Sequence, residues 1–139
     1  ILGPSGCGKS TLLGMIGGRL KPRRGQLEFD GRSINKARGR KLYALRREMG
    51  MLFQNSALLT DLSTFENIAF PLREQTRLPD EIIRLLVLMK LEIVGLRGAH
   101  EMMPSSLSGG MARRVALARA IVMDPKLVMY DEPFVGLDP

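Results

Sequence analysis

A glycine-rich stretch near the start of the chain carries the first candidate binding residues. Residues 3–11 fit the pattern of a glycine, four residues, a glycine, a lysine and then serine or threonine. Glycines can take positive φ angles, so this backbone can curl and point several N–H groups at one anion. Lys9 can bring an ammonium to the β- and γ-phosphates of a nucleotide, and the Ser10 hydroxyl can ligate Mg²⁺. The candidate phosphate-binding residues are Gly3, Ser5, Gly6, Cys7, Gly8, Lys9, Ser10 and Thr11.

A glycine-rich turn before an ordinary amphipathic helix is the alternative explanation of this stretch. The flanking sequence favours the phosphate loop, because apolar Ile1 and Leu2 read as the end of a strand and a helix is expected over residues 11–20. The positive end of that helix would lie at the loop. The Gly17-Gly18 pair is expected to end the helix. The residues expected on its buried side are Leu12, Leu13, Met15 and Ile16.

A second turn with similar chemistry lies near residue 108. Ser108, Gly109 and Gly110 precede a helical run over residues 112–123, so N–H groups at the start of this helix could also bind a phosphate. The alternative is an ordinary N-cap, in which the Ser108 hydroxyl accepts a hydrogen bond from the first turn. The sequence alone leaves both interpretations open.

Polar residues also follow two apolar strands. Residues 127–130 predict a buried strand that ends at Asp131 and Glu132, and residues 49–53 predict another that ends at Gln54. One carboxylate could hold Mg²⁺ while its neighbour takes a proton from an attacking water. A solvated acidic turn is the alternative, and the phosphate loop in the same chain favours the catalytic role. Most glutamines such as Gln54 are loop residues, although ligands do gather at strand ends in such sheets.

The remaining sequence predicts a short hairpin and a helical middle region. Residues 26–29 and 32–34 predict two strands joined at Asp30-Gly31, and a helix is expected near residues 42–47. The basic run over residues 38–47 is either a solvated face or a contact for acidic lipid. Residues 55–105 are more helical, with a helix capped by Ser63 and interrupted at Pro71.

The most apolar helix of this middle region is expected to start at residues 79–81. Burial would explain most of its apolar residues; part of this surface could instead serve a protein partner. Five of them fall on one stripe of the helix: Ile82, Leu85, Leu86, Met89 and Ile93.

Length, charge and composition narrow the possible functions. The 139 residues make about one domain, and the net charge of +7 permits anionic partners. Aromatic residues are 5% of the chain and tryptophan is absent, so there is little material for stacking on single-stranded nucleic acid. No run of about 18 apolar residues is present. Because the sequence opens on the end of a strand and stops after an acidic motif, we expect it to be a piece of a longer protein.

Taken together, these motifs resemble those of the ATP-binding-cassette ATPases. Residues 3–11 match the phosphate loop, Gln54 the Q-loop, residues 107–111 the signature, residues 127–132 the strand with its catalytic glutamate, and residues 136–138 the D-loop. The resemblance implies an α/β fold: a P-loop NTPase (RecA-like) core with a parallel sheet, a small antiparallel β piece and an inserted α-helical subdomain. It further implies that residues 1–54 and 106–139 form the core and residues 55–105 the helical subdomain.

Three stretches are similar to a narrower group, the ATPases of Mla- and Mce-type lipid transporters. These stretches are residues 107–114, in which Met111 replaces the usual glutamine, residues 131–139, and residues 52–58 with 67–74. The resemblance implies ATP hydrolysis that powers lipid transport across the cell envelope. A different importer substrate, a soluble ATPase acting on nucleic acid or the ribosome, and a regulatory module without turnover are the alternatives.

The resemblance also implies partners and roles. Two copies would pack head to tail and sandwich ATP, with Ser108, Gly109 and Gly110 of one copy facing the phosphate loop of the other and Asp138 near the nucleotide. The resemblance assigns Mg²⁺ to Ser10, Gln54 and Asp131, and it assigns catalysis to Glu132, Gln54 and Lys9. A membrane permease would contact the helical subdomain, which places the protein peripherally on the cytoplasmic face of the inner membrane. No direct contact with nucleic acid is expected.

Two family features are not found within this sequence. The aromatic residue that stacks on adenine would precede Ile1, and the histidine that senses the γ-phosphate would follow Pro139. His100 is not assigned that role, and a surface position is expected for it. These 139 residues alone are therefore expected to bind nucleotide weakly and to hydrolyse it poorly.

Overall fold

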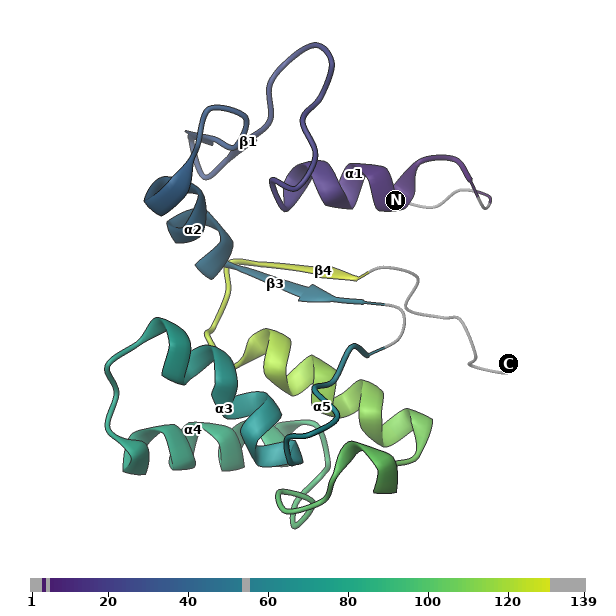
Figure 1. Ribbon diagram of the computed structural model, residues 1–139, viewed down its shortest axis with the longest axis vertical. Coiled ribbons are helices and arrows are strands. Elements are labelled where there is room, and N and C mark those ends of the chain that lie inside the picture. Colours follow the sequence, from purple (N-terminus) through teal and green to yellow (C-terminus); the bar gives the residue numbers. More distant parts are fainter. Residues whose placement is uncertain (1–3, 5, 54–55, 131–139) are drawn as a thin grey trace.

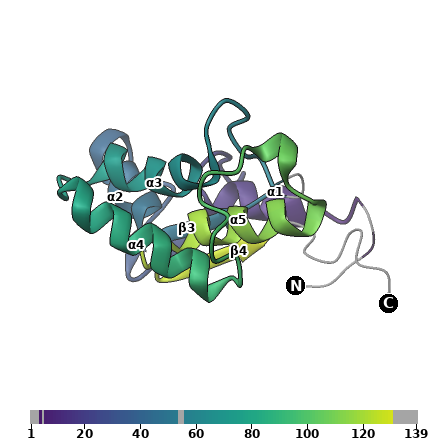
Figure 2. The same cartoon turned by 90° about the horizontal axis from the view of Figure 1, so that it is seen from below.

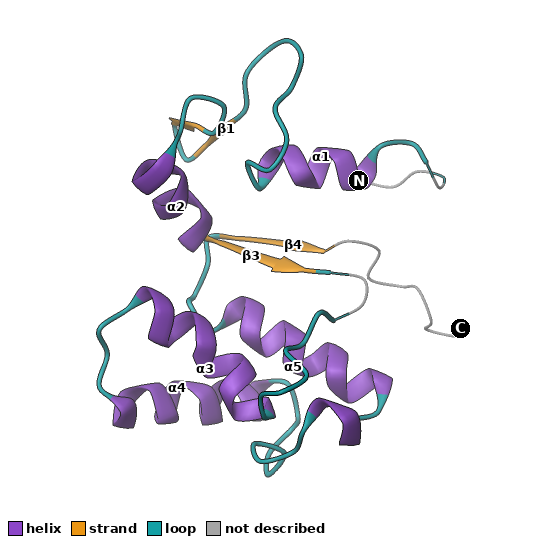
Figure 3. Cartoon of the chain, viewed as in Figure 1, coloured by secondary structure: helices purple, strands orange, loops and turns teal. Residues whose placement is uncertain are grey.

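The computed structural model describes residue 4, residues 6–53 and residues 56–130 (Figure 1). Helices and two small sheets alternate along this part of the chain, as Figure 3 shows. The elements are α1 (Lys9–Ile16), β1 (Glu28–Phe29), β2 (Arg32–Ser33), α2 (Gly39–Arg47), β3 (Met49–Leu52), α3 (Thr64–Gln75), α4 (Asp80–Ile93), the 3-10 helix η1 (Pro104–Ser106), α5 (Gly109–Ile121) and β4 (Leu127–Tyr130).

The predicted hairpin is confirmed in the first third of the chain. Strands β1 and β2 pair antiparallel around Asp30 and Gly31, whose φ angles are 52° and 70°. Two successive positive φ angles are typical of the two-residue turns that suit the twist of a hairpin. Beneath the hairpin, α2 closes a small core of Ile34, Ala37 and Leu45.

Charged residues join this hairpin to the parallel sheet. Glu48 accepts a hydrogen bond from the Arg32 guanidinium at 2.7 Å and lies 3.1 Å from the Lys126 ammonium, which also contacts Asp30 at 2.6 Å. The hydrogen bond from Arg32, followed by that from Lys126, lowers the pKa of Glu48 to about 2. Glu48 therefore remains negatively charged at neutral pH, where it holds two cations from distant parts of the sequence.

The β3–β4 pair is parallel, as the resemblance to the ATP-binding-cassette ATPases implies. Its register pairs Met49 with Leu127 and Leu52 with Tyr130, so the two strands end side by side. A parallel pair requires a crossover, and here the crossover consists of α3, α4 and α5. Figure 1 shows α1 on one side of this sheet and α5 on the other, and in Figure 2, which is seen from below, α5 overlies the sheet.

Gly50 allows β3 to approach α5 closely. A Cβ at this position would lie 2.4 Å from the Ala120 carbonyl oxygen and 3.1 Å from Cγ of Pro125. Because the nearest atom belongs to the backbone, the sheet and the helix would have to separate to relieve the contact. We expect Gly50→Ala to lower the free energy of unfolding by about 1–3 kcal/mol, the usual cost of overpacking a core.

Urea unfolding of the intact protein measures this effect, with Gly110→Ala as the matched control. A Cβ at Gly110 would meet nothing within 4 Å, so alanine there should be neutral or should stabilise the helix by about 1 kcal/mol. Equal unfolding midpoints for the two variants would contradict the close approach of β3 and α5.

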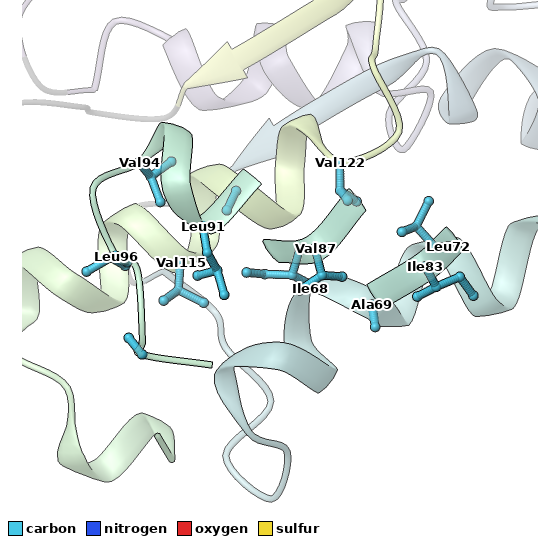
Figure 4. Close-up of a cluster of buried hydrophobic side chains, with 12 residues drawn as sticks. Ile68, Ala69, Leu72, Ile83, Val87, Leu91, Val94, Leu96, Val115 and Val122 are labelled. Carbon is cyan, nitrogen blue, oxygen red and sulfur yellow. The ribbon is translucent and has the colours of Figure 1, made fainter. Parts of the chain in front are cut away.

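The main core lies between α3, α4 and α5 (Figure 4). Ser63 caps α3, as predicted, by accepting a hydrogen bond from the Glu66 N–H at 3.2 Å. The core residues are almost inaccessible to solvent, and those labelled in the close-up are Ile68, Ala69, Leu72, Ile83, Val87, Leu91, Val94, Leu96, Val115 and Val122. This core orients α5 and therefore the residues at its start.

Two expectations about the helices are wrong. Pro71 lies inside α3 and does not interrupt it, because Ile68, Ala69 and Leu72 on the buried face hold the helix on both sides of the proline. α1 does not extend to Leu20: it ends at Ile16 with Gly17 as its C-cap, which confirms that the Gly17-Gly18 pair ends the helix. The four residues expected on its buried side are only half-buried, and its one buried residue is Gly14.

The α4 stripe also differs from the expectation that burial explains most of this helix. Ile83, Val87 and Leu91 face the core. Most of the predicted stripe is instead exposed: Ile82 by 41%, Leu85 by 64%, Met89 by 48% and Ile93 by 62%. Helix α4 lies on the outside of α3 and α5 (Figure 1), so this row faces away from the core. No described helix is both long and apolar enough to cross a membrane.

Candidate functional site

The described part of the phosphate loop has the backbone that the sequence predicts. Gly6 has a φ angle of 79°, and Gly8, the N-cap of α1, has φ 94° and ψ 12°. A Cβ at either position would meet nothing within 4 Å, so glycine is favoured by these φ angles and not by lack of space. Gly3 and Ser5 lie outside the described residues.

The charge of Lys9 is held at the loop. Its ammonium donates a hydrogen bond to the Pro4 carbonyl at 2.9 Å and lies 3.8 Å from Sγ of Cys7. The ladder of α1 begins with the Leu12 N–H, which donates to the Gly8 carbonyl at 2.9 Å, so the positive end of the helix dipole lies at the same loop. A cation and a helix N-terminus therefore converge on one exposed turn, an arrangement suited to a polyphosphate.

The loop is open to a ligand. Gly6, Cys7, Gly8, Ser10 and Thr11 are all exposed, and Cys7 is a free thiol. Ser10 lies in the first turn of α1, next to Lys9. The hydroxyl predicted to ligate Mg²⁺ is thus accessible beside the predicted phosphate site, an oxygen donor that suits this cation.

The second turn is an N-cap. The Ser108 hydroxyl accepts a hydrogen bond from the Met111 N–H at 3.2 Å, and α5 begins at Gly109, three residues earlier than predicted. Gly109 and Gly110 are exposed, and a Cβ at either would meet nothing within 4 Å. Each glycine costs about 1 kcal/mol in a helix relative to alanine. Packing among the described residues does not explain why glycine stands at these two positions. Glycines here would instead allow a ligand or another chain to approach the backbone closely.

The two strands that precede the polar motifs end side by side. Leu52 of β3 is paired with Tyr130 of β4, and the chain continues to Gln54 from one strand and to Asp131 and Glu132 from the other. Gln54, Asp131, Glu132 and Asp138 themselves lie outside the described residues, so their roles stay predictions. No cluster of three His, Cys, Asp or Glu side chains that could hold a metal occurs among the described residues.

Figure 1 shows how these parts are arranged. The loop before α1, the carboxyl ends of β3 and β4, and the start of α5 all lie toward the same side of the molecule, on the right in that view. The phosphate loop and the α5 N-terminus are nevertheless separated by the sheet.

Sequence reasoning missed two residues near the site and misplaced one. Arg119 of α5 donates a hydrogen bond to the Ser56 carbonyl in the segment after Gln54, and the buried Asn67 of α3 binds the same segment at Leu59. An arginine on the otherwise apolar face of a helix is the signal that could have indicated the first contact. His100 is half-buried, with 33% of its side chain exposed, rather than a surface residue.

Comparison with known proteins agrees with these motifs. The ABC transporter family model matches residues 1–135. The intermembrane phospholipid transport system ATP-binding protein MlaF of Haemophilus influenzae is 63% identical over all 139 residues, which cover 53% of that relative. The MlaF protein of Escherichia coli K12 is 58% identical, with 52% of it covered. The chain thus spans about half the length of these curated relatives.

A solved structure shows the same fold. The ATP-binding cassette MJ0796, in a dimeric post-hydrolysis state bound to ADP and Pi, superposes with a TM-score of 0.87 at 35% identity. The match covers 97% of this chain and 60% of that one. The α/β P-loop NTPase fold is therefore confirmed, and the chain belongs to the ABC transporter family.

Proposed function

We propose that this protein binds and hydrolyses ATP and that hydrolysis powers the transport of phospholipid across the cell envelope. The observation that carries the proposal is the exposed loop in which Gly6 and Gly8 have positive φ angles and Lys9 lies at the start of α1. The phospholipid substrate rests on the 63% identity to a relative named as a phospholipid transport ATP-binding protein.

In the proposed reaction the protein positions the triphosphate and neutralises its charge. Lys9 and the loop amides bind the phosphates, while Ser10, Gln54 and Asp131 hold Mg²⁺. The metal, when bound, stabilises charge on the phosphate oxygens. Glu132 takes a proton from the attacking water, whose oxygen forms a bond to the γ-phosphorus as the bond to the ADP oxygen breaks.

We further propose that two copies bind each ATP between them. Within one copy, the phosphate loop and the α5 N-terminus lie on opposite sides of the β3–β4 sheet (Figure 1). A second copy in head-to-tail contact can place its Ser108, Gly109 and Gly110 over the γ-phosphate, with Asp138 close to the nucleotide. The dimeric form of the cassette MJ0796 supports this arrangement.

Ser108→Arg tests the shared site. The arginine removes the capping hydroxyl and fills the space in which the two copies would approach, so we expect ATP turnover to fall on the order of 100-fold, as for loss of transition-state contacts. ATP binding by the isolated monomer should remain unchanged. The measurements are steady-state ATP hydrolysis and equilibrium binding of a fluorescent ATP analogue to the intact protein.

Ser63→Ala is the matched control, because Ser63 caps α3 with the same 3.2 Å bond and lies away from the phosphate loop. Ser63→Ala removes the cap of α3 and should lower the free energy of unfolding by about 1 kcal/mol. It should not reduce ATP turnover as Ser108→Arg does. Ser108→Arg protein that no longer binds ATP as a monomer would instead favour a purely structural cap.

We propose that the helical region, which includes α3 and α4, contacts a membrane permease and that the protein acts peripherally at the cytoplasmic face of the inner membrane. The exposed apolar row of Ile82, Leu85, Met89 and Ile93 supports a protein contact on this region, since such rows are typical of interfaces. The division into a core of residues 1–54 and 106–139 and a helical subdomain of residues 55–105 is part of the same proposal.

Leu85→Glu tests whether the row is an interface. A charge at the most exposed position of the row should reduce co-purification of the intact protein with the other subunits of its transport complex by about tenfold, because a buried unpaired carboxylate is costly. ATP hydrolysis by the isolated protein should not change. Arg84→Glu is the control, since it places the same carboxylate next in sequence but off the row; equal losses for both variants would argue against an apolar contact.

A further inference from the structure

Arg119 connects helix α5 to the chain that follows Gln54. Its guanidinium donates a hydrogen bond to the Ser56 carbonyl at 3.0 Å and makes a longer contact, 3.5 Å, to Oδ1 of Asn67. These residues are far apart in the sequence and belong to three segments: α5, the connection before α3, and α3 itself. One fork-shaped side chain therefore bridges all three.

Asn67 completes the same connection from the α3 side. The residue is fully buried, and its Oδ1 accepts a hydrogen bond from the Leu59 N–H at 2.8 Å. Its amide nitrogen lies 3.0, 2.9 and 3.0 Å from the carbonyl oxygens of Leu59, Leu62 and Ser63, respectively. Asn67 thus fixes residues 59–63, while Arg119 fixes the start of this connection at Ser56.

The backbone that Arg119 holds is in an unusual conformation. Ser56 and Ala57 have φ angles of 54° and 47°, values that residues other than glycine rarely adopt. Two such residues in succession persist only where the surrounding structure holds them. The Ser56 N–H donates to the Phe53 carbonyl at 3.1 Å, so the turn begins directly at the end of β3.

The electrostatics of Arg119 are unfavourable for a residue with only a packing role. Burial lowers the pKa of its guanidinium, and the two oxygens that it contacts belong to neutral groups, a backbone carbonyl and an amide. Nearby Val115, Ala118 and Val122 show that apolar side chains fit this part of α5 and the chain just after it. A half-buried arginine at this position is better explained by the contacts of its planar guanidinium.

We propose that Arg119 is a positioning residue, which holds the turn at Ser56 in a fixed position relative to the α5 helix that begins after Ser108. The inference rests on the proposed function, because it assigns Gln54 to the Mg²⁺ site. Arg119 touches neither nucleotide nor metal in this proposal; it acts through the backbone two residues after Gln54.

Arg119→Met in the intact protein removes both contacts and keeps much of the side-chain volume. We expect kcat to fall by about 10- to 100-fold, the usual effect of removing a group that orients a metal ligand, and the Mg²⁺ concentration for half-maximal activity to rise by a similar factor. The Kd for ATP measured without Mg²⁺ should stay within about twofold, because Lys9 and its loop are on the other side of the sheet.

Arg119→Lys keeps the charge, but its ammonium can replace only part of the contacts of the planar guanidinium. We therefore expect a kcat and a half-maximal Mg²⁺ concentration between those of the wild type and Arg119→Met. Arg114→Met is the control: Arg114 lies on the same helix and contacts the backbone oxygens of Val94 and Gly95. It should leave the Mg²⁺ dependence unchanged. A general loss of stability would lower the activity of both Arg119→Met and Arg114→Met. It would not raise the half-maximal Mg²⁺ concentration of Arg119→Met alone.

Hydrogen exchange provides a readout that does not depend on turnover. In both Arg119 variants the backbone amides of Leu59 and Leu62 should exchange their hydrogens at least about threefold faster than in the wild type. The exchange rates of the amides in α4 should change little. If Arg119→Met does not fold, Arg119→Lys decides by itself: wild-type exchange and a wild-type Mg²⁺ midpoint would overturn the proposal. An intact wild-type protein without ATPase activity would overturn the proposed function instead, and unchanged exchange would still refute the role of Arg119.

Discussion

Lys9→Ala will reduce ATP binding by the intact protein by about 10- to 100-fold and will reduce hydrolysis at least as much. A hydrogen bond to a charged group contributes about 1.5–3 kcal/mol, and Lys9 is the described cation that lies at the loop between Pro4 and α1. The alanine also removes the charge that would offset the negative γ-phosphate as the bond to ADP breaks, so kcat should fall in addition to affinity.

The structure makes this effect specific to nucleotide binding. The Lys9 ammonium donates to the Pro4 carbonyl on the loop, and Gly6 and Gly8 keep the loop backbone in its conformation independently of the side chain. We therefore expect the unfolding midpoint of Lys9→Ala to stay close to that of the wild type. Isothermal titration with ATP and steady-state hydrolysis measure the two losses.

Lys41→Ala is the control for loss of one positive charge, since Lys41 is an exposed lysine of α2. It should bind and hydrolyse ATP as the wild type does. Wild-type affinity in Lys9→Ala would show that the loop is only a turn before a helix, and the proposed function would then lose its main support.

The sequence predicts the local backbone of the candidate site. The spacing of Gly6, Gly8 and Lys9 predicts a curled loop before a helix, and the serine before Gly109 offers an N-cap as one of two interpretations. Both are confirmed, because each depends on residues within one turn of the chain. The same holds for the hairpin at Asp30 and Gly31.

Features that depend on distant residues could not be predicted in the same way. The α4 sequence is apolar on nearly every side, so periodicity cannot choose between the face with Val87 and the face with Leu85; contacts with α3 and α5 decide it. Pro71 stays within α3 for the same reason, since tertiary packing outweighs a missing backbone hydrogen bond. Arg119 and Ser56 are separated by 63 positions in the sequence, so no local sequence pattern predicts their contact.

Glu132→Gln will stop ATP hydrolysis while preserving ATP binding. Glutamine keeps the size of the side chain but cannot accept a proton at neutral pH, so the attacking water loses its base; removal of general base catalysis costs about 100- to 10,000-fold. The assignment rests on the sequence and on the end of β4, because Glu132 lies outside the described residues and follows Tyr130 by two positions.

The predicted loss differs from that of Lys9→Ala in a way that can be measured. Because Glu132→Gln leaves the phosphate loop and the α5 N-terminus intact, both can still engage ATP, and the two copies should remain associated with ATP between them. Size-exclusion chromatography with ATP and Mg²⁺ should show a dimer for Glu132→Gln and a monomer for Lys9→Ala. Glu101→Gln, a change at a carboxylate whose side chain is 90% exposed, should behave as the wild type.

Double variants distinguish ATP binding by the phosphate loop from the association of two copies through the bound nucleotide. The double variant Lys9→Ala/Glu132→Gln should be monomeric. It cannot bind the ATP that would lie between the two copies, so the block of hydrolysis has no effect on its association. Ser108→Arg with Glu132→Gln should bind ATP and yet remain monomeric, because the second face of the sandwich is lost. Near-normal turnover by Glu132→Gln would exclude Glu132 as the general base, and a nucleotide-independent dimer would exclude a site shared between two copies.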